Sequence, residues 1–169
     1  MKLTLILILV ALLAFFVPFF VYENVENYYD AFGFRGQDLF TRPWTLFTSV
    51  FLHGNVEHLL SNVLVWFFFG IAVEAELGKI KTAALFFIGA VAGNILSMLF
   101  YSPDTIFIGA SAGIFTLIGI GMMVKPLDVS FYPLVIPIPL ALLGMGYVLF
   151  NILALFTEPS SNISYIGHL

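Results

Sequence analysis

Long apolar runs with almost no charge are the feature that most constrains this chain. Of its 169 residues, 61% are hydrophobic and only 9% are charged, whereas a soluble domain carries about 25% charged residues. A chain of this composition cannot cover its own surface with polar side chains, so we expect it to lie in a lipid bilayer. Its apolar runs reach the length of roughly 20 residues that a spanning helix needs. The sequence therefore predicts an all-α, polytopic helical membrane protein.

The apolar runs divide the chain into five spans and the beginning of a sixth. We predict one membrane domain over residues 1–169, with spans at 3–22, 56–77, 81–101, 111–124 and 131–156, a sixth only begun at 161–169, and a long outer loop at 23–47. The first run is interpreted as an anchoring helix rather than a signal peptide, because no small-x-small cleavage site follows it. Three prolines are expected to delay or loosen the start of the fifth helix: Pro133, Pro137 and Pro139.

The basic residues divide by type between the two sides of the predicted spans. Every lysine falls on one side, and Arg35 and Arg42 fall on the other among most of the acidic residues. The positive-inside rule assigns the lysine side to the cytoplasm. We therefore expect an integral protein of a prokaryotic cell membrane with a cytoplasmic N-terminus. This orientation puts four polar residues in the outer half of the membrane, where they can share a cavity open to the outer side: His58, Asn62, Ser111 and His168.

Charge and cysteine content exclude several classes of function. The net charge is -4 and the chain has no basic cluster, which argues against nucleic acid as a partner. The absence of cysteine excludes disulfides, thiolate zinc sites and cysteine nucleophiles. His53 and His58 are five residues apart and lack the spacing of a metal-binding helix, so we predict no metal and no cofactor.

A serine and a histidine are the candidates for nucleophilic chemistry. Ser111 opens an apolar helix between small residues, and His168 opens another near the C-terminus. Polar residues at bilayer depth are costly and usually functional, and such a pair can act as nucleophile and general base. The structural alternatives are a serine that allows close helix packing and an ordinary interfacial histidine. No acidic residue is placed to orient His168, so the prediction is a Ser–His dyad.

Two further residues can supply hydrogen bonds to a developing oxyanion. His58 and Asn62 lie four residues apart, which puts them about 40° apart on one helical face. Their alternative role is hydrogen bonding between helices. The backbone N–H of Ser111, unpaired at its helix start, is a third donor. His53 is expected in the preceding loop, where it supports the site.

These residues, taken in order, resemble the rhomboid intramembrane serine proteases. The stretch from His53 to Asn62 is similar to the family's His-x4-His-x3-Asn pattern, and Gly109-Ala110-Ser111, with Phe115 four residues later, is similar to its Gly-x-Ser pattern. Tyr165-Ile166-Gly167-His168 resembles the start of the family's sixth helix. Two flanking stretches also match: Arg42-Pro43-Trp44 and Glu74-Ala75-Glu76-Leu77-Gly78.

The resemblance implies a six-helix bundle and a role for each matching residue. Ser111 would be the nucleophile and His168 the base, and His58, Asn62 and the Ser111 N–H would form the oxyanion hole. His53, Phe115 and Gly109 would support the site, with Phe115 as a shelf for the imidazole of His168. The implied partners are the lipid bilayer and the transmembrane helices of other proteins, which are cut near their outer ends.

The chain departs from the family pattern at three points. Thr45 follows Trp44 where many relatives have arginine, and Ala112 follows Ser111 where many have glycine. The sequence ends one residue after His168, where the family's sixth helix continues, so we expect either a fragment or a poorly held base. This keeps open an inactive relative that binds transmembrane helices. A small transporter or channel is disfavoured, because the charges gather at span ends.

Overall fold

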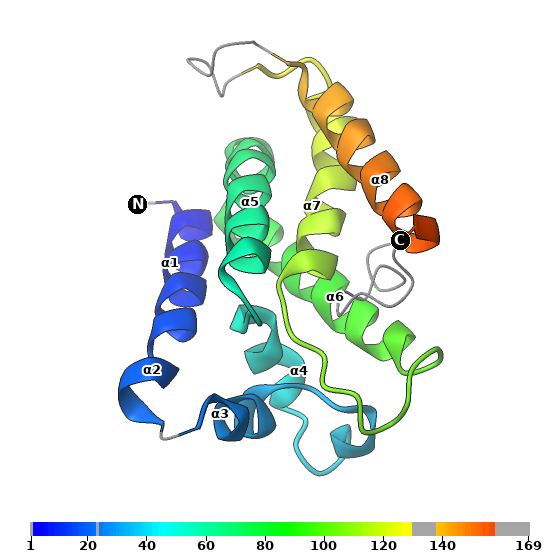
Figure 1. Cartoon of the computed structure of the whole chain (residues 1–169). Coiled ribbons are helices and arrows are strands. Elements are labelled where there is room, and N and C mark those ends of the chain that lie inside the picture. The colour runs from blue at the N-terminus through cyan, green and yellow to red at the C-terminus, as the bar shows by residue number, and fades with distance from the viewer. Residues whose placement is uncertain (1, 23, 130–137, 158–169) are drawn as a thin grey trace.

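The computed structural model describes residues 2–22, 24–129 and 138–157, with side chains up to residue 153. Over these residues the chain is helical apart from its connecting loops and an isolated antiparallel bridge between Phe34 and Phe107. Five longer helices form the bundle in Figure 1: α1 (Leu3–Phe16), α5 (Val56–Leu77), α6 (Lys79–Ser97), α7 (Ser111–Val124) and α8 (Leu140–Thr157). The all-α prediction is confirmed over this part of the chain.

The predicted spans agree with the helices to different degrees. α5 and α7 have the bounds that were predicted from the apolar runs, whereas α6 begins earlier, at Lys79, and ends at Ser97. The first run is interrupted after Phe16 and continues as the short helix α2 (Pro18–Val21), because Pro18 has no N–H to continue the hydrogen-bond ladder.

The end of the chain is described only in part. α8 begins at Leu140, directly after Pro139, so the predicted delay of the fifth helix is confirmed. The proline-containing segment at 130–137 and the expected beginning of the sixth helix at 161–169 lie outside the described residues.

The predicted outer loop is itself folded into short helices. Residues 23–47 contain α3 (Val25–Phe32), the 3-10 turn η1 (Gly36–Asp38) and most of α4 (Thr45–Thr48), and the 3-10 turn η2 (Ser49–Phe51) follows them before α5. The side chain of Asn24 caps α3 by accepting a 2.8 Å hydrogen bond from the N–H of Glu26. The hydroxyl of Tyr28 donates to the carbonyl of Ala14 on α1, which ties this layer to the bundle.

Helix α7 packs closely against both α5 and α6, and small residues permit that approach. A Cβ added at Gly113 would lie 2.6 Å from the ring of Phe86, and one at Gly89 would lie 1.8 Å from Oγ1 of Thr116. Phe86 in turn stacks on Trp66 of α5, with ring centroids 4.3 Å apart. Glycine at these helix contacts is the usual device for close packing in lipid.

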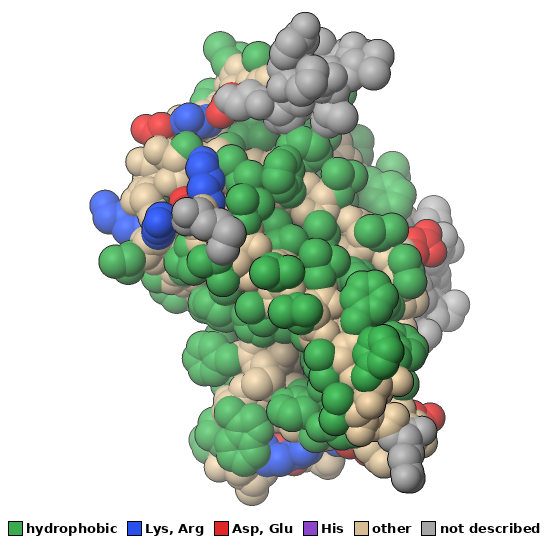
Figure 2. Space-filling model, turned by 90° about the vertical axis from the view of Figure 1, so that its left-hand side faces the viewer, with side chains coloured by type: hydrophobic (Ala, Val, Ile, Leu, Met, Phe, Trp, Pro, Cys, Tyr) green, Lys and Arg blue, Asp and Glu red, His purple; other side chains and the backbone are tan. Residues whose placement is uncertain are grey.

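The outer surface of the bundle is apolar. Figure 2 shows hydrophobic side chains across the middle of one face, with lysine and arginine toward its upper and lower parts. Within the described residues, three helical stretches are long and apolar enough to cross a membrane: Leu3–Val21, Val56–Leu77 and Lys79–Ser97. Exposed leucine and phenylalanine along these stretches, such as Leu13 and Phe20, suit a lipid environment, and the chain is an integral membrane protein.

The two ends of the bundle carry different cations. We call the end with Lys2, Lys79, Lys81 and Lys125 the lysine end, and the end with Arg35 and Arg42 the arginine end. At the lysine end Glu74 of α5 accepts hydrogen bonds from the N–H groups of Leu3 and Thr4 and from the Thr4 hydroxyl, at 2.9, 2.8 and 2.6 Å. A carboxylate of α5 therefore caps the first turn of α1.

Candidate active site

Ser111 is the first residue of α7 and lies within the depth of a membrane. The helix runs from Ser111 to Val124, and Lys125 follows it at the lysine end. Fourteen residues at 1.5 Å each place Ser111 about 20 Å from that end, inside a hydrocarbon core of roughly 30 Å. Its side chain is half-buried, and its N–H belongs to the first turn, where no helical carbonyl is available.

The start of α5 presents His58 and Asn62 on one helical face. The side chain of Asn55 caps this helix by accepting a 2.7 Å hydrogen bond from the N–H of His58. One turn further on, Asn62 is almost completely buried. The sequence prediction that both residues share a face is supported by their position in a regular helix.

Gly109 brings the chain that leads into Ser111 directly onto this face. Its φ is +118°, a conformation that residues with a Cβ rarely adopt. A Cβ at this position would lie 2.9 Å from both Cε1 and Nε2 of His58 and 3.8 Å from Nδ2 of Asn62. Glycine is therefore required twice here, by the backbone turn and by the contact with the imidazole.

A hydrogen-bonded tether holds Gly109 in place. Its N–H donates to the carbonyl of Ser49 at 2.9 Å, and Ser49 is buried. The amide of Asn94, from α6, donates to the Ser49 hydroxyl at 3.2 Å. Sequence analysis did not single out either residue for the site, because nothing local marks a backbone carbonyl as the partner of a distant glycine.

The layer of short helices between α2 and α5 also binds the segment that leads into Gly109. Phe34 and Phe107 exchange two backbone hydrogen bonds, at 3.1 and 2.7 Å. The guanidinium of Arg35 donates to the carbonyl of Asp104 at 3.1 Å. The segment between α6 and α7 is therefore fixed on the arginine side before it reaches Gly109.

His53 lies behind the two donors of α5 and is fully enclosed. It is in the loop before α5, as predicted, and 1% of its surface is exposed. Its Nδ1 lies 3.2 Å from the carbonyl of Phe51 and its Nε2 lies 3.0 Å from Nδ2 of Asn62. A carbonyl can only accept and an amide nitrogen can only donate, so this ring is a neutral imidazole with its proton on Nδ1.

Burial is the main reason why His53 stays neutral. It lowers the pKa of the imidazole from 6.5 to about 3, with a smaller contribution from the nearby His58. The bond from Asn62 uses one of the two N–H groups on its amide nitrogen. His53 thereby orients Asn62 and leaves the second N–H of that amide for another acceptor.

The remaining predicted site residues have different outcomes. Phe115 stacks at a tilt on Tyr147 of α8, with ring centroids 5.4 Å apart. His168, the predicted base, lies outside the described residues, so the shelf that Phe115 was expected to form for it stays a prediction. The structure brings His58 and Asn62 to Gly109, two residues before Ser111, and sets His53 behind Asn62.

Comparison with known proteins gives a family match over most of the chain. A model of the rhomboid domain matches residues 41–169. RHOMBOID-like protein 4 of Arabidopsis thaliana is 44% identical over 80 residues, which cover 47% of this chain and 20% of that protein. Rhomboid-like protease 1 of Toxoplasma gondii is 30% identical over 126 residues, which cover 75% of this chain and 42% of that protein. The chain thus spans less than half the length of these curated relatives.

Proposed function

Because the chain belongs to the rhomboid family, we propose that it is an intramembrane serine endopeptidase that cleaves transmembrane helices of other proteins. The observation that carries this proposal is the contact of Gly109 with the His58 imidazole and the Asn62 amide. It sets two hydrogen-bond donors beside the chain that enters α7, whose first residue is a serine. Packing alone does not require donors of this kind at a glycine with positive φ.

Each residue has a defined chemical role in the proposed reaction. Oγ of Ser111 attacks the scissile carbonyl while His168 takes its proton, and His168 then returns the proton to the leaving amine. The oxyanion accepts hydrogen bonds from His58, Asn62 and the N–H of Ser111. Donors of this kind contribute roughly 2.7–4 kcal/mol each to the transition state in other serine proteases. Water then hydrolyses the acyl-enzyme.

The position of Ser111 sets conditions on the substrate. A helix in lipid keeps its carbonyls in its own hydrogen bonds, so the substrate must unwind locally before Ser111 can attack. Small or helix-breaking residues favour that step. Ser111 lies toward the arginine end, which the positive-inside rule assigns to the outer side, so we expect cleavage near the outer end of the substrate helix.

The decisive experiment is labelling of the full-length protein by a fluorophosphonate probe in detergent. We expect covalent labelling that is lost in Ser111→Ala and in His168→Ala, while both variants keep the thermal unfolding temperature of the parent. Labelling that persists in Ser111→Ala would refute the nucleophile assignment. A folded protein that shows no labelling at all would favour the alternative, an inactive rhomboid relative that binds transmembrane helices.

A further inference from the structure

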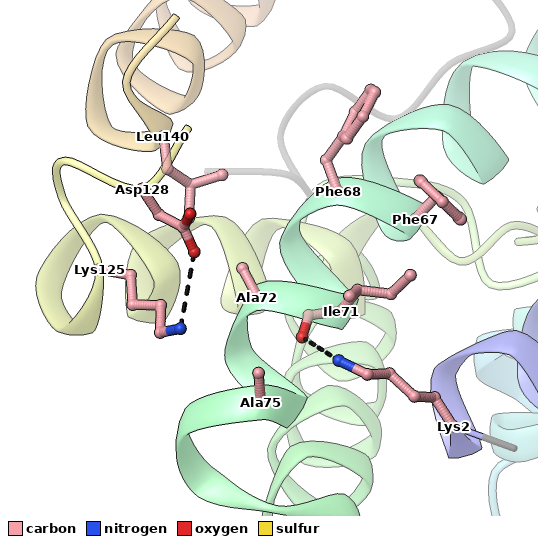
Figure 3. Close-up of a pocket in the computed structure, with 9 residues that line it drawn as sticks. All are labelled: Lys2, Phe67, Phe68, Ile71, Ala72, Ala75, Lys125, Asp128 and Leu140. Carbon is pink, nitrogen blue, oxygen red and sulfur yellow. Dashed lines mark hydrogen bonds and ion pairs between the residues drawn. The ribbon is translucent and has the colours of Figure 1, made fainter. Parts of the chain in front are cut away.

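A pocket lies at the lysine end of the bundle, away from the candidate active site. It has a volume of about 260 Å³ and lies between the start of α1, the second half of α5, the end of α7 and the start of α8. Figure 3 shows two alanines of α5, Ala72 and Ala75, between the side chains that enter from both sides. Their small size leaves the space open. Nothing in the proposed proteolytic reaction uses this pocket.

Two basic side chains line the pocket from opposite sides. Lys2 reaches in from α1 and Lys125 from the end of α7, and Figure 3 shows their amino groups on opposite sides of the α5 alanines. Among the described residues, Asp128 is the one acidic side chain in the lining, and Glu76, outside the lining, is a second carboxylate near Lys125. Lys125 is therefore balanced by two carboxylates, whereas Lys2 forms no ion pair within the described residues, so the attraction for an anion is centred on Lys2.

Contacts with the described residues leave the hydrogen-bonding capacity of both ammonium groups partly unused. Nζ of Lys2 donates to the carbonyl of Ile71 at 3.2 Å, and that carbonyl belongs to the interior of α5. Nζ of Lys125 lies 3.6 Å from Asp128 and 3.8 Å from Glu76, which are ion-pair contacts beyond hydrogen-bond length. Because an ammonium has three N–H groups, each lysine can still donate to a bound anion.

The part of the pocket formed by the middle of α5 is apolar and continues onto the lipid-facing surface. Phe67 and Phe68 line the pocket on α5, and Phe67 is 44% exposed. Apolar side chains do not stabilise a small soluble anion, whereas an anionic lipid can place its head at the lysines and its chains against the phenylalanines. The pocket also opens at the helix ends, which is the depth of the headgroups in a bilayer.

We propose that this pocket binds an anionic phospholipid from the leaflet at the lysine end. Its phosphate lies between the amino groups of Lys2 and Lys125, and one acyl chain follows Phe67 and Phe68 toward the membrane core. Basic pockets between transmembrane helices take headgroups in this way. The bound lipid joins the start of α1 to the end of α7, so it stabilises the folded bundle by an amount that grows with the ratio of the free lipid concentration to the dissociation constant.

The test measures the thermal unfolding temperature of the full-length protein in neutral detergent as phospholipid is added. Phosphatidylglycerol is expected to raise this temperature progressively with its concentration, and phosphatidylcholine is not. Glycerol 3-phosphate, which offers the phosphate without chains, is expected to have no effect at the same concentration. Equal effects of the two phospholipids would overturn the proposal, and so would a full effect of glycerol 3-phosphate.

Substitutions locate the effect in the pocket. Lys2→Gln and Lys125→Gln are each expected to weaken the apparent affinity for phosphatidylglycerol about five-fold. Lys81→Gln is the matched control, because Lys81 lies at the same end of the bundle but does not line the pocket. Ala75→Leu fills the space without changing charge and is expected to abolish the effect. If Lys81→Gln weakens binding as much as the two pocket lysines do, the pocket is not the site.

Discussion

The two ends of α5 both carry polar residues, and they use them in opposite ways. At the lysine end both carboxylate oxygens of Glu74 accept hydrogen bonds, three in all, from the first turn of α1. At the arginine end His58 faces Gly109, and Asn62 donates one N–H of its amide to His53. Buried polar groups in a helical membrane protein need partners. A filled set of partners indicates a structural joint, and donors kept available beside a serine indicate a site for a ligand.

The strongest test of this contrast substitutes a glycine with positive φ at each end. Gly109→Ala adds a Cβ 2.9 Å from the His58 ring, so it displaces a proposed oxyanion donor. We expect the rate of fluorophosphonate labelling to fall about 100-fold, with a loss of unfolding free energy of about 2 kcal/mol from backbone strain.

Gly78→Ala is the matched control. Gly78 joins α5 to α6 with a φ of +81°, and no atom lies within 4 Å of the position of an added Cβ. The variant is expected to lose a similar amount of stability while its folded fraction keeps the parent labelling rate. Equal losses of labelling in the two variants would show that strain, and not contact with His58, causes the effect.

The next largest effect is expected at the joint. Glu74→Gln keeps the shape of the side chain but replaces one accepting oxygen by an amide that cannot accept, so at least one buried donor of α1 loses its partner. We expect a loss of about 3 kcal/mol in unfolding free energy, measured by denaturation in detergent micelles. Labelling per folded molecule is expected to stay at the parent value. A large change in that rate would mean that the lysine end is coupled to the site.

Sequence reasoning succeeded where the determinants are local. The bounds of α5 follow from an apolar run preceded by Asn55, whose side chain caps the helix. The helical pitch then fixes His58 and Asn62 on one face without knowledge of any other element.

The tether of Gly109 has no such local signature. Its acceptor is the backbone carbonyl of Ser49, and every residue has a carbonyl, so the partner depends on how η2 and the α7 entry meet in space. The bond from Asn94 to the Ser49 hydroxyl depends on the same tertiary arrangement. The short helices of the outer layer were also predicted only as a loop, because each is too short to show helical periodicity.

Acidification is expected to weaken the arginine end selectively. The pKa of His53 is about 3 in the folded protein against 6.5 without burial, so between these values the unfolded chain binds more protons. Stability therefore falls as the pH drops below about 6.5, by about 2 kcal/mol at pH 5, and the loss is complete near pH 3. Unfolding temperatures of the parent and of His53→Ala, measured from pH 7 to pH 5, check this.

The His53→Ala variant is expected to be less stable than the parent at pH 7, but its unfolding temperature should change less with pH. Parallel curves of unfolding temperature against pH would exclude His53 as the titrating group.

The smallest effect is expected at the outer end of the tether. Asn94→Ala removes the donor to the Ser49 hydroxyl, at a cost of about 1 kcal/mol in unfolding free energy. Loss of this bond is expected to displace Ser49 slightly, and with it Gly109 and Ser111. Because a small misplacement of a reacting group slows catalysis in enzymes generally, we expect the labelling rate to fall about tenfold.

The control for this prediction is Asn151→Ala on α8. Asn151 is also buried in an apolar helix, and its amide donates to the carbonyl of Tyr147 in the same helix at 2.9 Å. A similar loss of stability with an unchanged labelling rate is expected there. If Asn94→Ala and Asn151→Ala affect labelling equally, the tether has no positioning role, and the His58 contact alone must hold Gly109. If only Asn94→Ala lowers the labelling rate, the hydrogen bonds from α6 through η2 position Gly109. The donors of α5 are then available to a substrate because a separate set of bonds holds the chain in place.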